Sequence, residues 1–258
     1  MQEINAIDTH CHIHYAPLET LKPITISDVM HEGPYYTAYW DTLSQMERAA
    51  KISTVLASPM EALADRADAV QANEDMHQMV QDIPNLYQWV VIDPQNEITF
   101  EQADRMLQNE KCVGIKLHPR MHEYSLAEYG EKVFSFAEKR SAIVQIHPDW
   151  AADYVAFADK FPNITIILAH LGGVHHIDAI KAAKHRNIYA DTSGKASLKN
   201  MLIEYAVSQV GSERILFGTD TYAAGAQRGR IAYALISQQD KENILYNNAK
   251  KLFGLNCV

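Results

Sequence analysis

The sequence predicts an α/β fold, a (β/α)8 TIM barrel that forms a single domain over residues 1–258. Short apolar runs rich in β-branched residues alternate with longer segments of helical periodicity, a pattern typical of βα units around a parallel sheet. Eight such pairs fit within 258 residues, the usual size of this barrel. No low-complexity tract or Gly/Ser-rich linker divides the chain, so we expect one domain.

Each expected strand is a short run in which apolar residues dominate, because the strands of a parallel sheet are buried on both faces. The clearest example is Ile-Thr-Ile-Ile-Leu-Ala at residues 164–169. In order along the chain, the expected strands are 4–8, 53–58, 86–92, 113–117, 142–146, 164–169, 187–191 and 214–218.

Helices are expected in the segments between these strands. Residues 125–139 carry the best apolar stripe with a period of 3.6 residues, which predicts a helix with one face on the barrel. The expected helices are 60–80, 100–108, 125–139, 151–161, 175–185, 197–210, 226–237 and 239–253.

Residues 15–40 break this rhythm, with Pro17, Pro23 and Pro34 among several tyrosines and a tryptophan. A loop of this length within one domain is usually functional or poorly ordered. It follows the first strand, so we expect it to lie over the catalytic face. It would serve there as a substrate lid or as an aromatic plug of the barrel mouth, and the sequence leaves both open.

Composition limits the class of partner. The formal net charge of −9 repels polyanions, so we expect a small-molecule substrate and no nucleic acid. The three cysteines form no C-x-x-C pair, no signal peptide is evident, and the longest apolar stretch is too short to span a bilayer. We therefore expect a cytoplasmic protein without a membrane partner, and the sequence is compatible with a homodimer.

The first strand ends in Asp-Thr-His-Cys-His at residues 8–12. Alternate residues of a strand point to the same face, so His10 and His12 are expected to project side by side into the barrel mouth, with Cys11 directed toward the helices. Two imidazoles on one rigid element make half of a site for zinc or a similar ion. Asp8 is expected on the face of the histidines, where it would accept a hydrogen bond from an imidazole.

Three more strands end in a histidine or an aspartate, namely His147, His170 and Asp220. The ends of barrel strands converge in space, however far apart they lie in the sequence. Several imidazole nitrogens and a carboxylate, with a position left for water, are typical of a catalytic metal site. We expect one divalent ion there, most simply Zn²⁺, with Mn²⁺ as the alternative. Asp220 would bind the ion and also take a proton from its water.

The fourth expected strand carries Lys116 and His118 on one face. Three roles remain open for Lys116: a carbamylated bridge between two metals, a cation that holds a substrate carboxylate or oxyanion, or a partner of a core acid such as Asp8. His118 would orient substrate, donate a proton or pack beside Pro119. Further candidates for substrate contact lie just beyond strand ends: Arg120, Trp150 and Tyr222.

Together these motifs resemble the amidohydrolase superfamily, and most closely its amidohydrolase-related branch, which includes aminocarboxymuconate-semialdehyde decarboxylase. The similarity extends over almost the whole chain and includes the closing segment 244–254. The motifs that carry it are Asp-Thr-His-Cys-His at 8–12, Gly-Ile-Lys-Leu-His-Pro at 114–119, Ile-His at 146–147, Ala-His-Leu-Gly-Gly at 169–173 and Phe-Gly-Thr-Asp at 217–220.

The resemblance implies roles for the matching residues. His10 and His12 would be metal ligands from the first strand and His147 the ligand from the fifth. His170 would touch the metal or act as base and polarising group, and Asp220 would bind the metal and handle the proton of water. The Lys-Leu-His-Pro context of Lys116 is more like that of relatives with one metal ion.

The function we expect from the sequence is a metal-dependent hydrolase that uses metal-activated water to cleave an amide, lactone or other ester bond in a small substrate. The sequence leaves open whether that substrate bears a carboxylate. His170 would polarise the carbonyl and Asp220 would return the proton to the leaving group. The alternative is a metal-dependent non-oxidative decarboxylase of an aromatic or dienoic acid, in which Lys116 or Arg120 holds the departing carboxylate. A barrel that binds metal or metabolite without turnover is the non-enzymatic alternative. A nuclease is disfavoured by the net charge.

Overall fold

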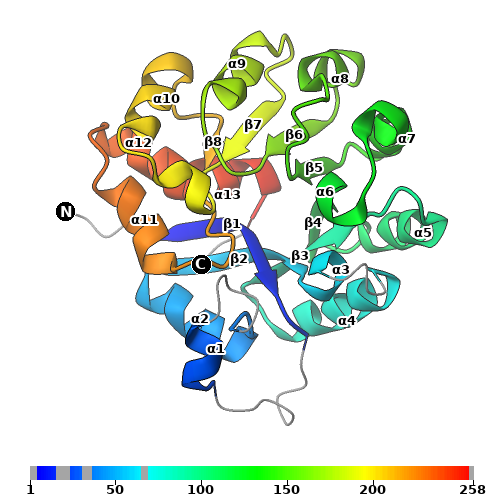
Figure 1. The fold of residues 1–258 in the computed structure, drawn as a ribbon, viewed down its shortest axis with the longest axis horizontal. Coiled ribbons are helices and arrows are strands. Elements are labelled where there is room, and N and C mark those ends of the chain that lie inside the picture. Colours follow the sequence, from blue (N-terminus) through cyan, green and yellow to red (C-terminus); the bar gives the residue numbers. More distant parts are fainter. Residues whose placement is uncertain (1–4, 16–23, 31–36, 65–68, 256–258) are drawn as a thin grey trace.

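In the computed structural model, the described residues form a ring of eight parallel strands surrounded by helices (Figure 1). The structure describes residues 5–15, 24–30, 37–64 and 69–255. The strands follow one another around the ring in chain order, from β1 to β8. This arrangement confirms the predicted (β/α)8 barrel.

Each expected strand is present, although the bounds differ by a few residues. The largest difference is in β1, which extends past residue 8 and so contains both histidines of the first motif. The strands are β1 Ala6–Ile13, β2 Ile52–Pro59, β3 Leu86–Val91, β4 Cys112–Leu117, β5 Ile143–Ile146, β6 Thr165–Leu168, β7 Ile188–Asp191 and β8 Ile215–Leu216.

The ring closes where β1 passes the end of β8. The amide of Thr9 donates to the carbonyl of Phe217 at 2.9 Å, and the amide of Asp220 donates to the carbonyl of His10 at 2.7 Å. These hydrogen bonds tie the two ends of the barrel wall together. They also bring the first and the last expected site motifs into direct contact.

Helices cover the outside of the ring, and most agree with the expected segments. The helix expected at 60–80 is present as two pieces, with residues 65–68 outside the described part of the chain. The helices outside the first loop are α3 Glu61–Ala64, α4 Ala69–Asp82, α5 Glu97–Met106, α6 Pro119–His122, α7 Leu126–Glu138, α8 Tyr154–Lys160, α9 Val174–Ala182, η2 Lys195–Leu198, α10 Leu202–Val210, α11 Ala224–Ala232, α12 Gln238–Glu242, η3 Asn243–Asn247 and α13 Asn248–Phe253.

The region after β1 contains two helices that the sequence did not predict, α1 Ile26–Met30 and α2 Trp40–Ala49. The buried residues of α2 are Leu43, Ser44 and Glu47, and the partly buried Trp40 also packs against the core. Two of the three buried residues are polar, which interrupts the apolar stripe of this helix. Much of the expected loop, residues 16–23 and 31–36, lies outside the described residues, and its role as a lid stays a prediction.

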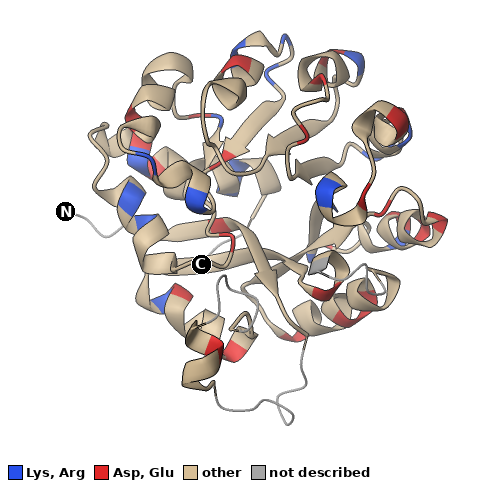
Figure 2. Cartoon of the chain, viewed as in Figure 1, with Lys and Arg blue, Asp and Glu red and all other residues tan. Residues whose placement is uncertain are grey.

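The outer surface carries charges of both signs around the helices (Figure 2). The interior is mostly apolar, and its buried polar side chains include Asn73, Gln88 and Asn187 as well as those near the carboxyl ends of the strands. There the side chains of Trp89 and Gln145 both donate to the carbonyl of Thr9, at 3.0 and 2.9 Å. Among the described helices, none has the length and apolar character that a membrane span requires.

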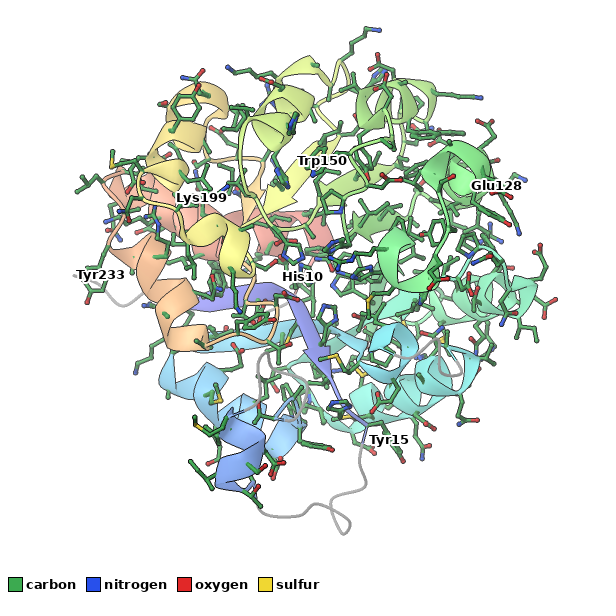
Figure 3. The ribbon with its side chains drawn as sticks, in the orientation of Figure 1. His10, Tyr15, Glu128, Trp150, Lys199 and Tyr233 are labelled. Atoms are coloured by element: carbon green, nitrogen blue, oxygen red, sulfur yellow. The ribbon has the colours of Figure 1, made fainter. Side chains whose placement is uncertain are left out.

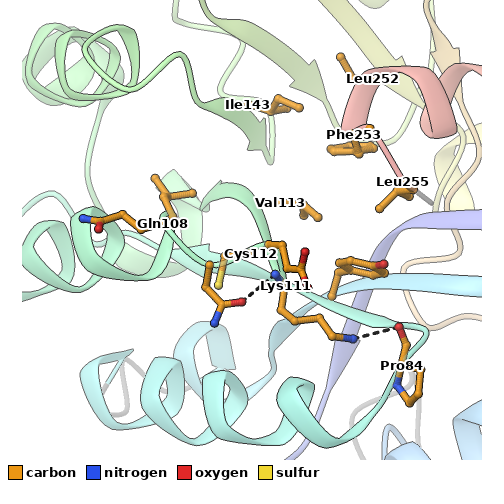
Figure 4. Close-up of a pocket in the computed structure, with 14 residues that line it drawn as sticks. Pro84, Gln108, Lys111, Cys112, Val113, Ile143, Leu252, Phe253 and Leu255 are labelled. Atoms are coloured by element: carbon orange, nitrogen blue, oxygen red, sulfur yellow. Dashed lines mark hydrogen bonds between the residues drawn. The ribbon is translucent and has the colours of Figure 1, made fainter. Parts of the chain in front are cut away.

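A pocket of about 600 Å³ lies at the opposite end of the barrel, where β4 and β5 begin (Figure 4). Nζ of Lys111 is held there by the carbonyls of Ile83, Pro84 and Leu86, at 2.7 to 3.1 Å. Active sites of this fold lie at the carboxyl ends of the strands, so the opposite end is read as a stability region. The functional site is therefore expected at the other end of the barrel.

Candidate metal centre

Strand β1 places two imidazoles side by side, as the alternation of its residues predicts. Nε2 of His10 lies 3.2 Å from Nε2 of His12, and the two side chains are nearly inaccessible to solvent. His10 lies near the middle of the ring of strands in Figure 3.

The opposite nitrogen of each ring is held by another side chain. Nδ1 of His10 donates to Oδ2 of Asp191 at 3.0 Å, and Nδ1 of His12 lies 2.7 Å from Oγ of Ser58. Such contacts fix the orientation of an imidazole and leave Nε2 for a ligand. Metal-binding histidines generally make a hydrogen bond of this kind through the ring nitrogen that does not bind the metal.

Asp220 completes a group of three donors. Its Oδ1 lies 3.1 Å from Nε2 of His12 and 3.7 Å from Nε2 of His10, and the ligand atoms of the three residues all lie within 4.8 Å of one another. The backbone of Asp220 has φ of 56°, a left-handed conformation that a residue with a side chain adopts at a cost. Two imidazoles and a carboxylate that converge in this way fit a divalent ion.

The protonation states of these groups suit a cation. Burial, together with the nearby Lys116, lowers the pKa of His10 to about 3. Burial also lowers the pKa of His12. Burial opposes the ionisation of Asp220, but its hydrogen bond with His12 and the charge of His10 hold its pKa well below the ordinary value. Neutral imidazoles and an ionised carboxylate are the forms that bind metal.

His170 stands beside this group, at the end of β6. Its ring stacks on that of His10 with a centroid distance of 4.9 Å, and its Nδ1 lies 2.9 Å from Oγ of Ser193. His170, His10 and Asp191 form a second group whose ligand atoms lie within 4.8 Å of one another. The backbone of His170 also has a left-handed φ, 63°. Strain of this kind gathers at functional sites.

His147, which follows β5, contacts His170 and His118. Its Nδ1 is 3.2 Å from Nε2 of His170, and its ring stacks on His118 with centroids 4.2 Å apart. Among the described residues, it belongs to none of the groups whose donor atoms lie within 4.8 Å of one another. Burial and the neighbouring His170 lower the pKa of His147 to about 3. Its assignment as a ligand stays a prediction.

Lys116 is fully buried below the histidines. Its Nζ donates to Nε2 of His10 at 2.7 Å and to Oε1 of Gln145 at 2.9 Å, and burial lowers its pKa to about 8. Of the three roles left open by the sequence, the pairing with Asp8 is not what the structure contains. The ammonium group instead faces the donor atoms of the site.

Asp8 occupies a different place from the one expected. It does not contact an imidazole ring; its carboxylate accepts from the hydroxyl and the amide of Thr219 and from the amide of His10. A register shift in the pairing of β1 with β2 between Asp8 and Cys11 breaks the alternation on which the expectation rested. The acceptor for His10 is Asp191 instead.

Sequence reasoning missed Asp191 and Ser193, which orient the rings. Oγ of Ser193 lies 2.9 Å from Nδ1 of His10 and donates to Oδ1 of Asp191. Burial opposes the ionisation of Asp191, but its charge interaction and hydrogen bond with His10 hold the pKa far below its ordinary range. A signal was present, because Asp191 is the last residue of an expected strand, as the predicted ligands are.

A pocket of about 340 Å³ adjoins the donors and is lined by His147, His170, Trp150, His175 and His176, among others. Trp150 packs against both of the last two rings, with centroid distances of 5.4 and 4.7 Å. Figure 3 shows Trp150 and Lys199 on one side of His10. Both residues line this pocket.

The other residues expected to contact substrate lie around the mouth of the barrel. His118 precedes α6, and its Nδ1 accepts from the amide of Met121 at 3.3 Å. Arg120 is exposed on α6, and Tyr222 is half-buried after β8 with Nζ of Lys195 5.6 Å from its ring centroid. Their contact with substrate stays a prediction.

Several solved structures share this fold over nearly their whole length. A 2,6-dihydroxybenzoate decarboxylase from Rhizobium is 18% identical, with a TM-score of 0.72 over 99% of this chain and 100% of its own. A 5-carboxyvanillate decarboxylase from Sphingomonas paucimobilis is 17% identical, with a TM-score of 0.72 over 98% of this chain and 100% of its own.

A 5-carboxyvanillate decarboxylase from Novosphingobium aromaticivorans, complexed with manganese and 4-hydroxy-3-methoxy-5-nitrobenzoic acid, is 16% identical. Its TM-score is 0.72 over 98% of this chain and 97% of its own. At these identities the likeness is one of fold. No curated protein matches the chain by sequence. The sequence profile described as amidohydrolase matches residues 7–255. The chain therefore belongs to the amidohydrolase family.

Proposed function

We propose that this protein is a metal-dependent non-oxidative decarboxylase of a small aromatic carboxylic acid. The observation that carries the proposal is the pocket of about 340 Å³ beside the donor atoms, whose walls include the planar rings of His147, Trp150, His175 and His176. Flat side chains favour a flat substrate, because stacked and edge-to-face contacts need a planar partner. A benzoate-type acid fits this wall chemistry.

The comparisons support the same class. The solved structures with this fold include a 2,6-dihydroxybenzoate decarboxylase complexed with 2,6-dihydroxybenzoate and a decarboxylase with bound manganese and an inhibitor, 2-nitroresorcinol. They favour the decarboxylase, which the sequence gave as the alternative, over the hydrolase that it ranked first.

The residues we propose as metal ligands are His10, His12 and Asp220, with His147 as a further candidate on the same face. His170, for which the sequence left open the roles of ligand and base, is assigned to the proton transfer. A divalent ion held by these residues would supply Lewis acidity toward oxygen atoms of the substrate. Nitrogen and carboxylate donors suit both zinc and manganese, so the donor set alone does not decide between them. Nε2 of His10 accepts a hydrogen bond from Nζ of Lys116 in this structure. A metal ion bound to Nε2 would therefore have to displace this hydrogen bond.

The remaining residues bind the acid and move the proton. The ammonium of Lys116 lies at the base of the site, where it attracts an anionic carboxylate, and Lys199 offers a second cation at the pocket wall. The carbon–carbon bond breaks, carbon dioxide leaves, and the electron pair that stays on the ring carbon takes a proton from the imidazole of His170. His170 regains this proton from water at the mouth. One carboxylate and one proton thus give one arene and one carbon dioxide.

Hydrolysis is the alternative that the same donors would permit, because a metal-bound water is also a nucleophile. The test supplies the metal-reconstituted protein with hydroxybenzoic acids in one series and with aryl esters, lactones and amides in another. We expect carbon dioxide and the decarboxylated phenol in equal amounts from the first series. Turnover confined to the second series, without carbon dioxide, would replace the proposal by the hydrolase.

A further inference from the structure

A third group of possible ligands lies behind the candidate metal centre, between β1 and α2. The ligand atoms of Asp8, Cys11 and Glu47 all lie within 4.8 Å of one another. The three residues are buried, with exposed fractions of 0%, 0% and 2%. None of them belongs to the donor group of His10, His12 and Asp220.

Local backbone geometry explains why β1 presents two of these side chains to the same helix. Asp8 and Cys11 are three residues apart, and in a regular strand they would point to opposite faces. The register shift between them changes this alternation, so both reach the side that faces α2. The bulge that displaced Asp8 from the imidazoles therefore also builds this cluster.

Glu47 gives the independent sign of a ligand. Both oxygens of its carboxyl group are buried and have no hydrogen-bond partner among the described residues. Buried polar groups in folded proteins are almost always paired, and a buried carboxyl group stays ionised only beside a partner of opposite charge. Glu47 lies on the inner face of α2, and its carboxyl group is directed into the cluster with Asp8 and Cys11.

We propose that Asp8, Cys11 and Glu47 bind a divalent transition-metal ion of the zinc class at a structural site distinct from the catalytic centre. One thiolate and two carboxylates are a donor set that zinc accepts and that calcium or magnesium would not select. The ion would offset the negative charge of the three ionised ligands, and it would give Glu47 the partner that no hydrogen bond among the described residues supplies. The proposal does not depend on the reaction catalysed at the other site.

The position of Asp8 gives this ion a role. The carboxylate of Asp8 already accepts from the amide of His10 and from the amide and hydroxyl of Thr219. Thr219 immediately precedes Asp220. An ion shared with Glu47 would therefore fasten α2 to the two backbone segments that carry the catalytic donors, at the point where the barrel closes.

Cobalt substitution tests the proposal, because a thiolate ligand gives Co²⁺ an intense near-ultraviolet charge-transfer band that nitrogen and oxygen ligands do not give. The chain has three cysteines, so the double variant Cys112→Ser, Cys257→Ser retains Cys11 alone. This variant, titrated with cobalt, is expected to show the band and to bind two equivalents of metal. Further replacement of Cys11 by serine is expected to abolish the band.

A second variant tests the same site without a cysteine substitution, so the test does not depend on whether the cysteine variants fold. Glu47→Gln retains the shape of the side chain and is expected to reduce metal content from two equivalents to one, with circular dichroism unchanged. The cobalt spectrum of the remaining ion should then lack the thiolate band. A folded Cys11-only protein that shows no charge-transfer band at saturating cobalt would overturn the proposal. Because the band reports sulfur ligation only, failure of the catalytic centre to bind metal would leave this test intact.

Discussion

Oδ2 of Asp191, at the end of β7, accepts a hydrogen bond of 3.0 Å from Nδ1 of His10 in the centre of the barrel. Both side chains are almost completely buried. This bond fixes the imidazole with Nε2 toward His12 and Asp220, so Asp191 determines how the proposed ligand is presented.

Replacement of Asp191 by asparagine removes the charge and retains the size of this partner. We expect metal affinity to fall by about 10- to 100-fold, the usual effect of losing a carboxylate that supports a ligating histidine. Competition with a chromophoric chelator measures this directly. The exposed Asp178 on α9 provides a control, since Asp178→Asn leaves the affinity unchanged. Equal affinities for Asp191→Asn and the wild type would show that His10 does not depend on this bond.

Asp220→Asn tests the proposed carboxylate ligand. Its Oδ1 lies 3.1 Å from Nε2 of His12, and asparagine supplies neither the charge nor the second anionic oxygen. We expect the variant to fold, with kcat lowered by roughly 10²- to 10⁴-fold, the range typical of a lost acid–base or electrostatic contribution. Steady-state kinetics on the substrate found by the assay above gives the value. An unchanged kcat in the folded variant would remove Asp220 from the site.

Gly114 in β4 is required by close packing. A Cβ at this position would lie 2.3 Å from the carbonyl oxygen of Ile143 and 2.7 Å from the ring of Trp89. We expect Gly114→Ala to lower the free energy of unfolding by about 3 kcal/mol, because the carbonyl belongs to the neighbouring strand and cannot move aside. Denaturant titration measures it.

The matched control is Gly225 in α11, where a Cβ would meet nothing within 4 Å. Gly225→Ala should leave stability unchanged or raise it by up to about 1 kcal/mol, since alanine favours helix. If both alanine variants lost stability equally, the crowding argument for Gly114 would be wrong.

Glu204 on α10 is held by Arg230 of α11, with Oε2 2.8 Å from a guanidinium nitrogen, and its Oε1 accepts from the amide of Leu235 at 2.9 Å. The hydrogen bond from Arg230 lowers the pKa of Glu204 to about 2, below its ordinary 4.5. A carboxyl whose folded-state pKa is depressed contributes stability above pH 4.5, and this is lost as the pH falls toward 2.

The Tm of Glu204→Gln should therefore lie below that of the wild type at pH 7, by an amount that reflects about 1 kcal/mol, and the gap should shrink as the pH falls from 4.5 toward 2. Glu131→Gln, which removes an exposed partner of Lys160, serves as the control and should change Tm little at any pH. A gap for Glu204→Gln that stays constant over this range would contradict the assignment.

The strands were predictable from the sequence because parallel barrel strands are buried on both faces and read as apolar runs. Helix α2 was not predicted, since two of its three buried residues, Ser44 and Glu47, are polar. To predict α2, one must know which elements it packs against. Those contacts depend on β1 and on the register shift within it.

The same limit applies to the candidate site. Strand alternation placed His10 and His12 together, and strand-end convergence brought in Asp220. Alternation failed for Asp8, because one irregularity in strand pairing moves a side chain to the other face. Convergence also predicts His147 as a ligand. Its Nδ1 lies 3.2 Å from Nε2 of His170, and its binding of a metal stays a prediction.

The central claim is that β1 and β8 together hold one catalytic metal ion. Anomalous diffraction from crystals saturated with Mn²⁺ tests it most directly, because the signal locates the ion without reference to activity. We expect an anomalous-difference peak within bonding distance of Nε2 of His10, Nε2 of His12 and Oδ1 of Asp220. Bound manganese at a position that engages none of these three atoms, with no peak between them, would contradict it.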